Sequence, residues 1–192
     1  MAKKKEFKPD RQSTSLLMRL YLTPRQRRTL LKWTLYSLVL VALSLLQDVI
    51  FCRLDIFGAT TDLVPCGIIL VCLLEGAEGG SVFSLVASTL YLFSGTAPGA
   101  YCILFITVPA VLVTAFRQAY LQVGFGAAML CSSVTVMVYE MLVFLVGAFL
   151  GLVGGDRFGV FVLTGVLSLV ALPVLYPLLT AIGRIGGQGW KE

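Results

Sequence analysis

The 192-residue chain has 58% hydrophobic side chains and only 13% charged ones, with a mean hydropathy of +0.92. A soluble globular domain averages about 45–50% apolar and about 25% charged residues, so this composition indicates a membrane protein. Histidine is absent from the sequence, which excludes the usual general base, the commonest metal ligand and an imidazole pH sensor. The five cysteines form no C-x-x-C pair and mostly lie in apolar runs, so we interpret them as small hydrophobic residues.

The positive charge is concentrated at the N-terminus. Residues 1–32 hold ten Lys and Arg against two acids, whereas the remaining 160 residues hold five against eight. We therefore expect a basic cytoplasmic tail and juxtamembrane segment (residues 1–22), a single transmembrane bundle domain (residues 23–183) and a short cytoplasmic tail (residues 184–192). Beside a membrane span, such a tail is expected to meet anionic lipid and no nucleic acid. The candidate lipid-surface contacts are Arg25, Arg27, Arg28 and Lys32.

Six apolar runs follow in chain order: residues 33–51, 63–74, 80–93, 100–116, 125–153 and 158–182. Thr23 as a cap with Pro24 at the first helical position predicts that a helix begins just before the first run. The second run has twelve residues, about 18 Å of helix against a hydrocarbon core of about 30 Å. It must borrow flanking residues, thin the bilayer or re-enter within protein.

These runs predict an all-α fold, a polytopic transmembrane helix bundle of about six spans, or five if the second run does not cross. With six spans, alternate loops carry thirteen Lys and Arg on the side of the N-terminus and two on the other side. The positive-inside bias then puts both the N- and the C-terminus in the cytoplasm.

The third run carries small and hydroxyl residues at three- and four-residue spacing. Such a stripe forms one face of a helix and lets two backbones approach closely. We expect this face to pack against another helix. Its members are Gly80, Ser84, Ala87, Ser88 and Tyr91. Gly147 and Gly151 form a further G-x-x-x-G pair, which is a weak motif in a chain with nineteen glycines.

Glu140 is the sharpest candidate for a functional side chain, because it lies near the middle of a long apolar run where an ionised carboxylate costs several kcal/mol. One hypothesis is a proton or cation site, or a polar clasp to a partner helix. The other is a protonated or hydrogen-bonded glutamate that ties two spans together. In the second case its partner is a hydroxyl group of Ser84, Ser88 or Thr114.

Gln47 and Asp48 are the other candidate intramembrane polar residues, and they could simply mark the end of the first span. Asp62, Glu75 and Glu78 are interpreted as boundary charges. Two acids around residue 76 are too few oxygen ligands for a hard cation, and no Gly-Gly pair has a lysine at phosphate-loop spacing. We therefore expect no catalytic residue, no cofactor and no metal, and hence a protein that is not an enzyme.

Residues 33–116 resemble the MreD family of bacterial rod-shape-determining membrane proteins. The matching positions are Gln47 at the end of the first span, Gly58, Asp62-Leu63, Glu75-Gly76, Gly79-Gly80, the Ser94-Gly95 turn and Pro98-Gly99. The chain departs from the family pattern at Tyr91, where an aspartate is common, and in the third span, where serine or alanine replaces a glycine. The role of that family acid therefore does not carry over.

The resemblance implies a non-enzymatic subunit of the cell-elongation machinery in the bacterial cytoplasmic membrane. Its partners would be the single-span protein MreC, the MreB filament, the RodA glycosyltransferase and a penicillin-binding transpeptidase, which together build side-wall peptidoglycan. The implied fold is a six-helix bundle similar to the substrate-binding subunits of energy-coupling-factor vitamin transporters. The alternative function is therefore a substrate-binding subunit of a small-solute importer, which would need a cavity with several convergent polar groups.

Overall fold

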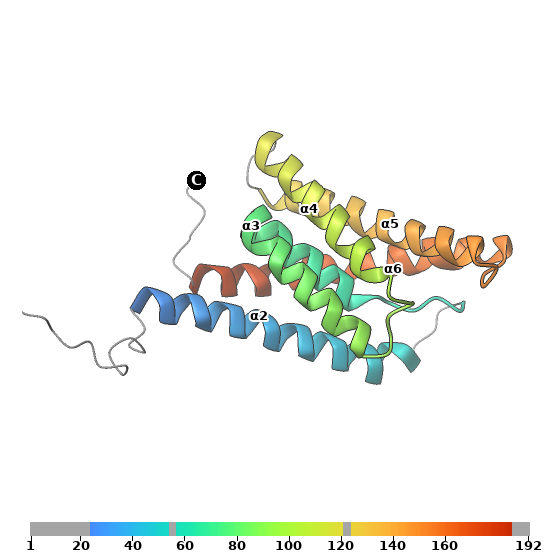
Figure 1. Ribbon diagram of the computed structural model, residues 1–192, viewed down its shortest axis with the longest axis horizontal. Coiled ribbons are helices and arrows are strands. Elements are labelled where there is room, and N and C mark those ends of the chain that lie inside the picture. Colours follow the sequence, from blue (N-terminus) through green and yellow to red (C-terminus); the bar gives the residue numbers. More distant parts are fainter. Residues whose placement is uncertain (1–23, 54–56, 121–123, 186–192) are drawn as a thin grey trace, which may run out of the picture.

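The computed structural model describes residues 24–53, 57–120 and 124–185. Its long elements are all α-helices, joined by loops and two short 3₁₀ turns, Phe51–Arg53 and Gly155–Arg157 (Figure 1). The helices are α2 (Pro24–Val49), α3 (Leu63–Phe93), α4 (Cys102–Tyr120), α5 (Phe125–Phe149) and α6 (Phe158–Ile185). All five are long and apolar enough to cross a membrane. The prediction of an all-α, multipass membrane bundle is therefore confirmed.

Helix α3 reverses its direction at Gly76, so its residues form two antiparallel arms. Gly76 has φ 87° and ψ 174°, a conformation outside the helical region and open essentially to glycine alone. Beyond it, Gly80 lies against the backbone of Cys72, and a Cβ at residue 80 would stand 2.7 Å from both Cα and O of Cys72. Arm 1 (residues 63–75) and arm 2 (residues 77–93) thus run side by side, as the adjacent ribbons of α3 show (Figure 1).

Arm 1 is the centre of the bundle. Every residue from 63 to 74 is buried, and α3 contacts each of the other four long helices. Thirteen helical residues span only about 20 Å, less than the hydrocarbon core of about 30 Å. The surrounding helices bury arm 1 within the protein, so this short helix does not have to face lipid along its length.

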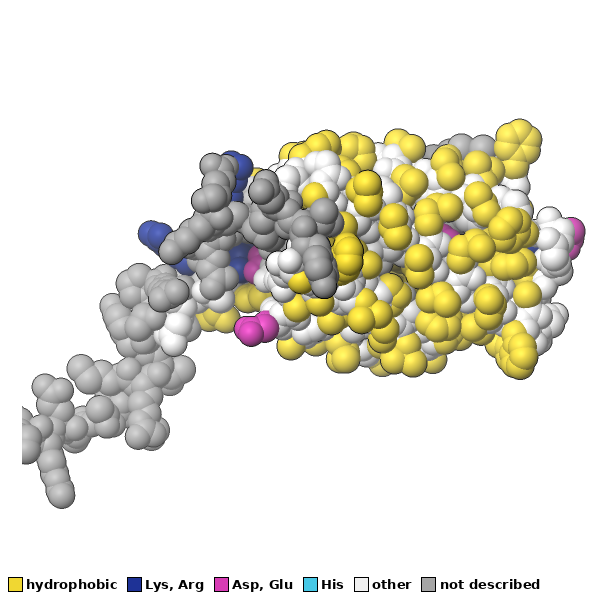
Figure 2. Space-filling model, turned by 90° about the horizontal axis from the view of Figure 1, so that it is seen from above, with side chains coloured by type: hydrophobic (Ala, Val, Ile, Leu, Met, Phe, Trp, Pro, Cys, Tyr) yellow, Lys and Arg dark blue, Asp and Glu magenta, His cyan; other side chains and the backbone are white. Residues whose placement is uncertain are grey.

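Helix α2 packs on the bundle through one stripe of side chains. Lys32, Tyr36, Leu43 and Gln47 are buried at helical spacing, while the opposite face is exposed and apolar. Hydrophobic side chains cover the body of the molecule, and most charged side chains lie toward its two ends (Figure 2). This distribution is the one expected for a bundle whose outer surface faces lipid.

Helix α5 ends earlier than the apolar run predicts, because Gly151 terminates it. Gly151 has φ 70° and donates its N–H to the Ala148 carbonyl, while Leu152 N–H bonds to the Gly147 carbonyl. This is the Schellman pattern of a helix C-terminus. The G-x-x-x-G pair is thus part of a helix cap in the structure, and the span ends at Phe149 and not at residue 153. The expected cap Thr23 and the tail of residues 1–22 lie outside the described residues.

Candidate functional site: two buried polar clusters

Gln47 of α2 caps the N-terminus of arm 1. Its Oε1 accepts hydrogen bonds from the backbone N–H groups of Leu63 and Val64, both at 3.0 Å. Its Nε2 donates to Asp62 Oδ1 at 3.3 Å and to the Tyr91 hydroxyl at 3.5 Å. Asp62 occupies the N-cap position itself but makes no capping hydrogen bond with its side chain. A buried helix start needs partners for its first N–H groups, and here one glutamine from another helix supplies them.

The carboxyl group of Glu140 meets that of Asp62 beside this cap. Glu140 lies on α5 and is 3% exposed, and each of the two side chains is a hydrogen-bond partner of the other. Two carboxyl groups can share a hydrogen bond only when one of them carries a proton. Burial raises the pKa of Asp62, which lies just before the membrane-spanning part of α3.

Further polar groups surround this pair. The Asp62 backbone N–H donates to the Ser168 hydroxyl of α6 at 2.9 Å, and Ser168 is fully buried. The Tyr139 hydroxyl of α5 is buried without a hydrogen-bond partner, as is Oε1 of Glu140. We call this group the carboxyl cluster. It consists of Gln47, Asp62, Tyr91, Tyr139, Glu140 and Ser168.

A second polar group, the tip cluster, surrounds the reversal of α3 at the other end of the bundle. Lys32 Nζ forms an ion pair with Glu75 Oε2, and the Tyr36 hydroxyl donates to Glu75 Oε1 at 2.9 Å. Arg117 of α4 donates from Nη1 to the Leu73 carbonyl at 2.6 Å, near the C-terminal end of arm 1. Positive side chains are favourable there, because the last carbonyls of a helix lack backbone partners and carry a partial negative charge.

Of the three predicted intramembrane polar residues, the structure brings Gln47 and Glu140 together through Asp62. None of the hydrogen bonds described above involves Asp48, which is half-buried with Oδ1 lacking a partner. Asp62 and Glu75, predicted to be boundary charges, instead take part in the two polar clusters. The available signal was their position at the two ends of an entirely apolar twelve-residue run.

The hydroxyl groups expected to pair with Glu140 bond elsewhere. The Ser84 and Ser88 hydroxyls donate to carbonyls one turn earlier, and Thr114 donates to the Ala110 carbonyl at 2.6 Å. Such local bonds satisfy a hydroxyl within its own helix. Hence the partner of Glu140 is a second acid.

The predicted packing face of the third run is buried inside this chain. From the start of arm 2 to its end, the residues of this face contact first arm 1, then α4 and then α2. Gly80 contacts the Cys72 backbone, Ser88 lies 3.3 Å from the Thr107 hydroxyl, and Tyr91 reaches Gln47. Ser84 and Ala87 are 0% and 4% exposed.

The expected lipid-surface contacts divide into two groups. Arg27 and Arg28 are exposed on the first turns of α2, while the side chain of Arg25 lies outside the described part of the chain. Lys32 differs from the expectation, because its side chain is 5% exposed and paired with Glu75. Its ammonium group also lies 5.2 Å from the centre of the Trp33 ring. The charge of Lys32 is therefore paired inside the protein, where the ion pair links α2 to the hairpin tip.

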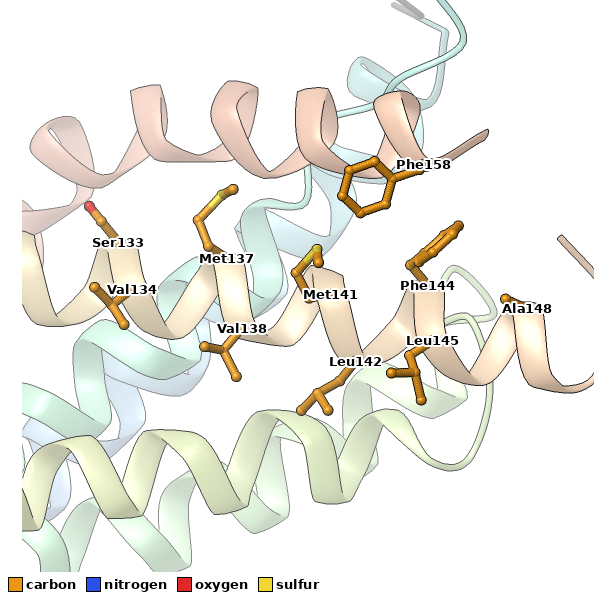
Figure 3. Close-up of a pocket in the computed structure, with 10 residues that line it drawn as sticks. All are labelled: Ser133, Val134, Met137, Val138, Met141, Leu142, Phe144, Leu145, Ala148 and Phe158. Atoms are coloured by element: carbon orange, nitrogen blue, oxygen red, sulfur yellow. The ribbon is translucent and has the colours of Figure 1, made fainter. Parts of the chain in front are cut away.

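Apolar grooves run along the described part of the bundle surface. One, of about 620 Å³, follows α5 to the start of α6, where the Phe144 and Phe158 rings meet edge to face at 5.3 Å (Figure 3). Met137 and Met141 line it as well. Another groove, of about 360 Å³, lies between α2 and arm 2 and includes Ser37 and Ser44. Grooves of this kind accept apolar chains or helices and offer few polar contacts to a solute.

Among the residues that the structure describes, no group of three or more cysteine, aspartate or glutamate side chains is placed to hold a metal ion. Comparison of the chain with known protein families, curated proteins and solved structures finds no match in any of the three. The resemblance to the MreD family therefore stays a prediction from the residues that carry it.

Proposed function

We propose that this protein is a non-enzymatic multipass subunit of the bacterial cell-elongation machinery. In this role it binds an MreC-like single-span protein in the cytoplasmic membrane. Together with MreB, RodA and a penicillin-binding transpeptidase, it helps to organise side-wall peptidoglycan synthesis.

The observation that carries the proposal is the structural use of the residues that resemble the MreD family. Gln47 caps arm 1 next to Asp62, Gly76 makes the reversal, and Gly80 allows the two arms to touch. These positions are scattered in the sequence but act on one feature, the central hairpin. Because the residues that resemble the MreD family all build this hairpin, they support the same fold as in that family and, through the fold, the same role.

The distribution of polar groups supports a scaffold over an importer subunit. Gln47, Glu75 and Lys32 are engaged in caps or pairs within the bundle. A solute-binding subunit would instead direct several such groups into a cavity. The grooves described above are apolar, which suits contact with the helices of other membrane proteins.

The arrangement of basic residues supports a cytoplasmic location for both termini. Lys32 and Arg117 lie around the hairpin tip, and Gly183 near the end of α6 approaches Tyr36 in the same place. The start of α2 and the end of α6 lie at the same end of the bundle (Figure 1). Positive charge at this end favours the cytoplasmic side.

The first test is detergent co-purification of the tagged protein from its native membrane, with the co-eluting proteins identified by mass spectrometry. Recovery of an MreC-like single-span protein, with or without the wall synthases, is the expected result. Recovery of an ATPase pair with a coupling membrane subunit would overturn the proposal and assign the chain to a small-solute importer.

The second test is depletion of the protein followed by complementation. Depleted cells should lose rod shape while solute uptake is unchanged. Wild type and Gly79→Ala should restore the shape, whereas Gly80→Ala, which forces the arms of the hairpin apart, should restore it poorly. Lost solute uptake in cells of normal shape would contradict a role in elongation.

A further inference from the structure

A half-buried acid, Asp62, and a buried acid, Glu140, meet in the carboxyl cluster without a basic side chain among their described contacts. Asp62 receives a hydrogen bond from Gln47 Nε2, and its backbone N–H is taken by Ser168. Glu140 is 3% exposed, and its Oε1 has no partner. Lys32 is the only lysine among the residues that the structure describes, and it is paired with Glu75 at the hairpin tip. If both acids were ionised, the described contacts would therefore offer no positive side chain to compensate their two negative charges.

Each helix packed around the pair contributes neutral groups. The titratable groups that interact with the acids are the hydroxyls of Tyr91 and Tyr139 and the thiol of Cys66. Helices α2 and α6 contribute the amide of Gln47 and the hydroxyl of Ser168. These groups can orient a carboxyl group, but none of them neutralises it. Neutralisation has to come from a bound proton or cation.

The geometry favours a proton over a metal ion. Alkali and alkaline-earth cations in proteins prefer about six or more oxygen ligands. Here Oε1 of Gln47 is already committed to the N–H groups of Leu63 and Val64. Tyr139 is 1% exposed, its hydroxyl lacks a hydrogen-bond partner, and it interacts electrostatically with Asp62 and Glu140. A neutral acid with a proton to donate can satisfy such groups, and two carboxyl groups in contact require one.

We propose that Asp62 and Glu140 form a binding site for a single proton, which the two carboxyl groups share. Asp62 is half-buried whereas Glu140 is almost fully buried, so the proton enters and leaves through Asp62. That route opens at the end of the bundle opposite the hairpin tip. Release of the proton leaves two negative charges between α5 and the start of arm 1, which weakens the contact there. The inference is independent of the role in cell elongation.

Infrared difference spectroscopy of the purified full-length protein in detergent tests the site directly. At neutral pH the wild type should show the carbonyl band of a protonated carboxylic acid, and this band should disappear at alkaline pH. Glu140→Gln should abolish the band, since glutamine keeps the size of the side chain and can donate to Asp62. Glu78→Gln makes the same chemical change at an exposed position and should leave the band intact. A band that Glu140→Gln leaves unchanged would overturn the proposal.

Asp62→Asn gives a second, independent reading if Glu140→Gln fails to fold. In Asp62→Asn, Glu140 stays protonated but has an amide as its partner, so the carbonyl band of the acid should remain at a shifted frequency. The same spectra are recorded with and without Na⁺. A wild-type spectrum that lacks the acid band at neutral pH, together with Na⁺-dependent stabilisation, would assign the pair to a cation and overturn the proposal.

Thermal unfolding at a fixed scan rate supplies a third readout. The folded pair holds a proton that the unfolded chain releases at lower pH, so stability should fall as the pH rises above the ordinary range of a carboxyl group. Glu140→Gln should flatten this dependence, and Glu78→Gln should preserve it. An equal pH dependence in Glu140→Gln and wild type would contradict proton binding at this site.

Discussion

Replacing Gly80 by alanine tests the reversal of α3, on which the arrangement of the bundle depends. An added Cβ would stand 2.7 Å from both Cα and O of Cys72, whereas ordinary contacts begin at 3.4 Å. The obstructing atoms belong to the backbone of arm 1, so no side-chain rotation relieves the overlap. The two arms must therefore separate by several tenths of an ångström along their contact. Gly79→Ala is the matched control, because its Cβ would make ordinary contacts, at 3.4 Å with the Trp33 ring and 4.0 Å with Glu75 Cβ.

The expected magnitude follows from comparing the two variants. Overpacking a well-packed interior costs about 1–3 kcal/mol, and the rigid backbone at this contact favours the upper end of that range. In both variants, replacing glycine by alanine in a helix adds the same stabilisation, about 1 kcal/mol, to the free energy of unfolding. Their difference therefore isolates the overlap and should reach about 3 kcal/mol in the free energy of unfolding. For a chain of this size that corresponds to a difference of roughly 6–12 °C in the melting temperature.

The natural cysteines provide the assay. Cys66, Cys72, Cys102 and Cys131 are buried and unpaired, so a thiol-reactive dye reports their exposure during a thermal ramp. Gly80→Ala should release them at a lower temperature than Gly79→Ala and the wild type. Equal melting temperatures for the two variants would refute the close contact between the arms.

The remaining predictions use the same assay. Gly76→Ala should lower the free energy of unfolding by about 1–3 kcal/mol, because an alanine is strained at φ 87°. The control Gly126→Ala, whose added Cβ has no atom within 4 Å, should be neutral or stabilising. Equal effects of the two substitutions would contradict the strained conformation at Gly76. Gln47→Ala should cost about 2–5 kcal/mol, since it leaves two buried N–H groups of arm 1 without acceptors, and a loss below about 1 kcal/mol would mean that this cap contributes little. Glu75→Gln should cost about 3–5 kcal/mol by leaving the buried charge of Lys32 unpaired. Adding Lys32→Met should recover most of that loss, and a double variant as unstable as the single one would exclude the ion pair as the cause.

Much of the fold is predictable from the sequence because its signals are local. Apolar runs locate each helix to within a few residues at most ends, and Pro24 opens α2 where the sequence predicts a helix start. The position of Glu140 inside an apolar run also identifies it as a buried acid, independent of any partner. These features follow from the cost of exposing polar groups to lipid, which acts on each segment separately.

The partners of the polar residues depend on which helices become neighbours. Asp62 and Glu140 are 78 positions apart, and they meet because arm 1 lies at the centre of the bundle. Lys32 is expected at the lipid surface when its own segment is considered, yet the hairpin tip brings Glu75 to it and buries the charge.

Composition and apolar patterning are enough to predict a helical membrane protein, the approximate positions of its helices and the burial of Glu140. The packing of the helices is needed to show that a helix too short to span lipid lies inside the protein and that Gln47 caps it. The physical reason is that burial in a membrane is set by the composition of each segment, whereas hydrogen bonds and ion pairs between helices require the reversal at Gly76 to bring distant residues within a few ångströms.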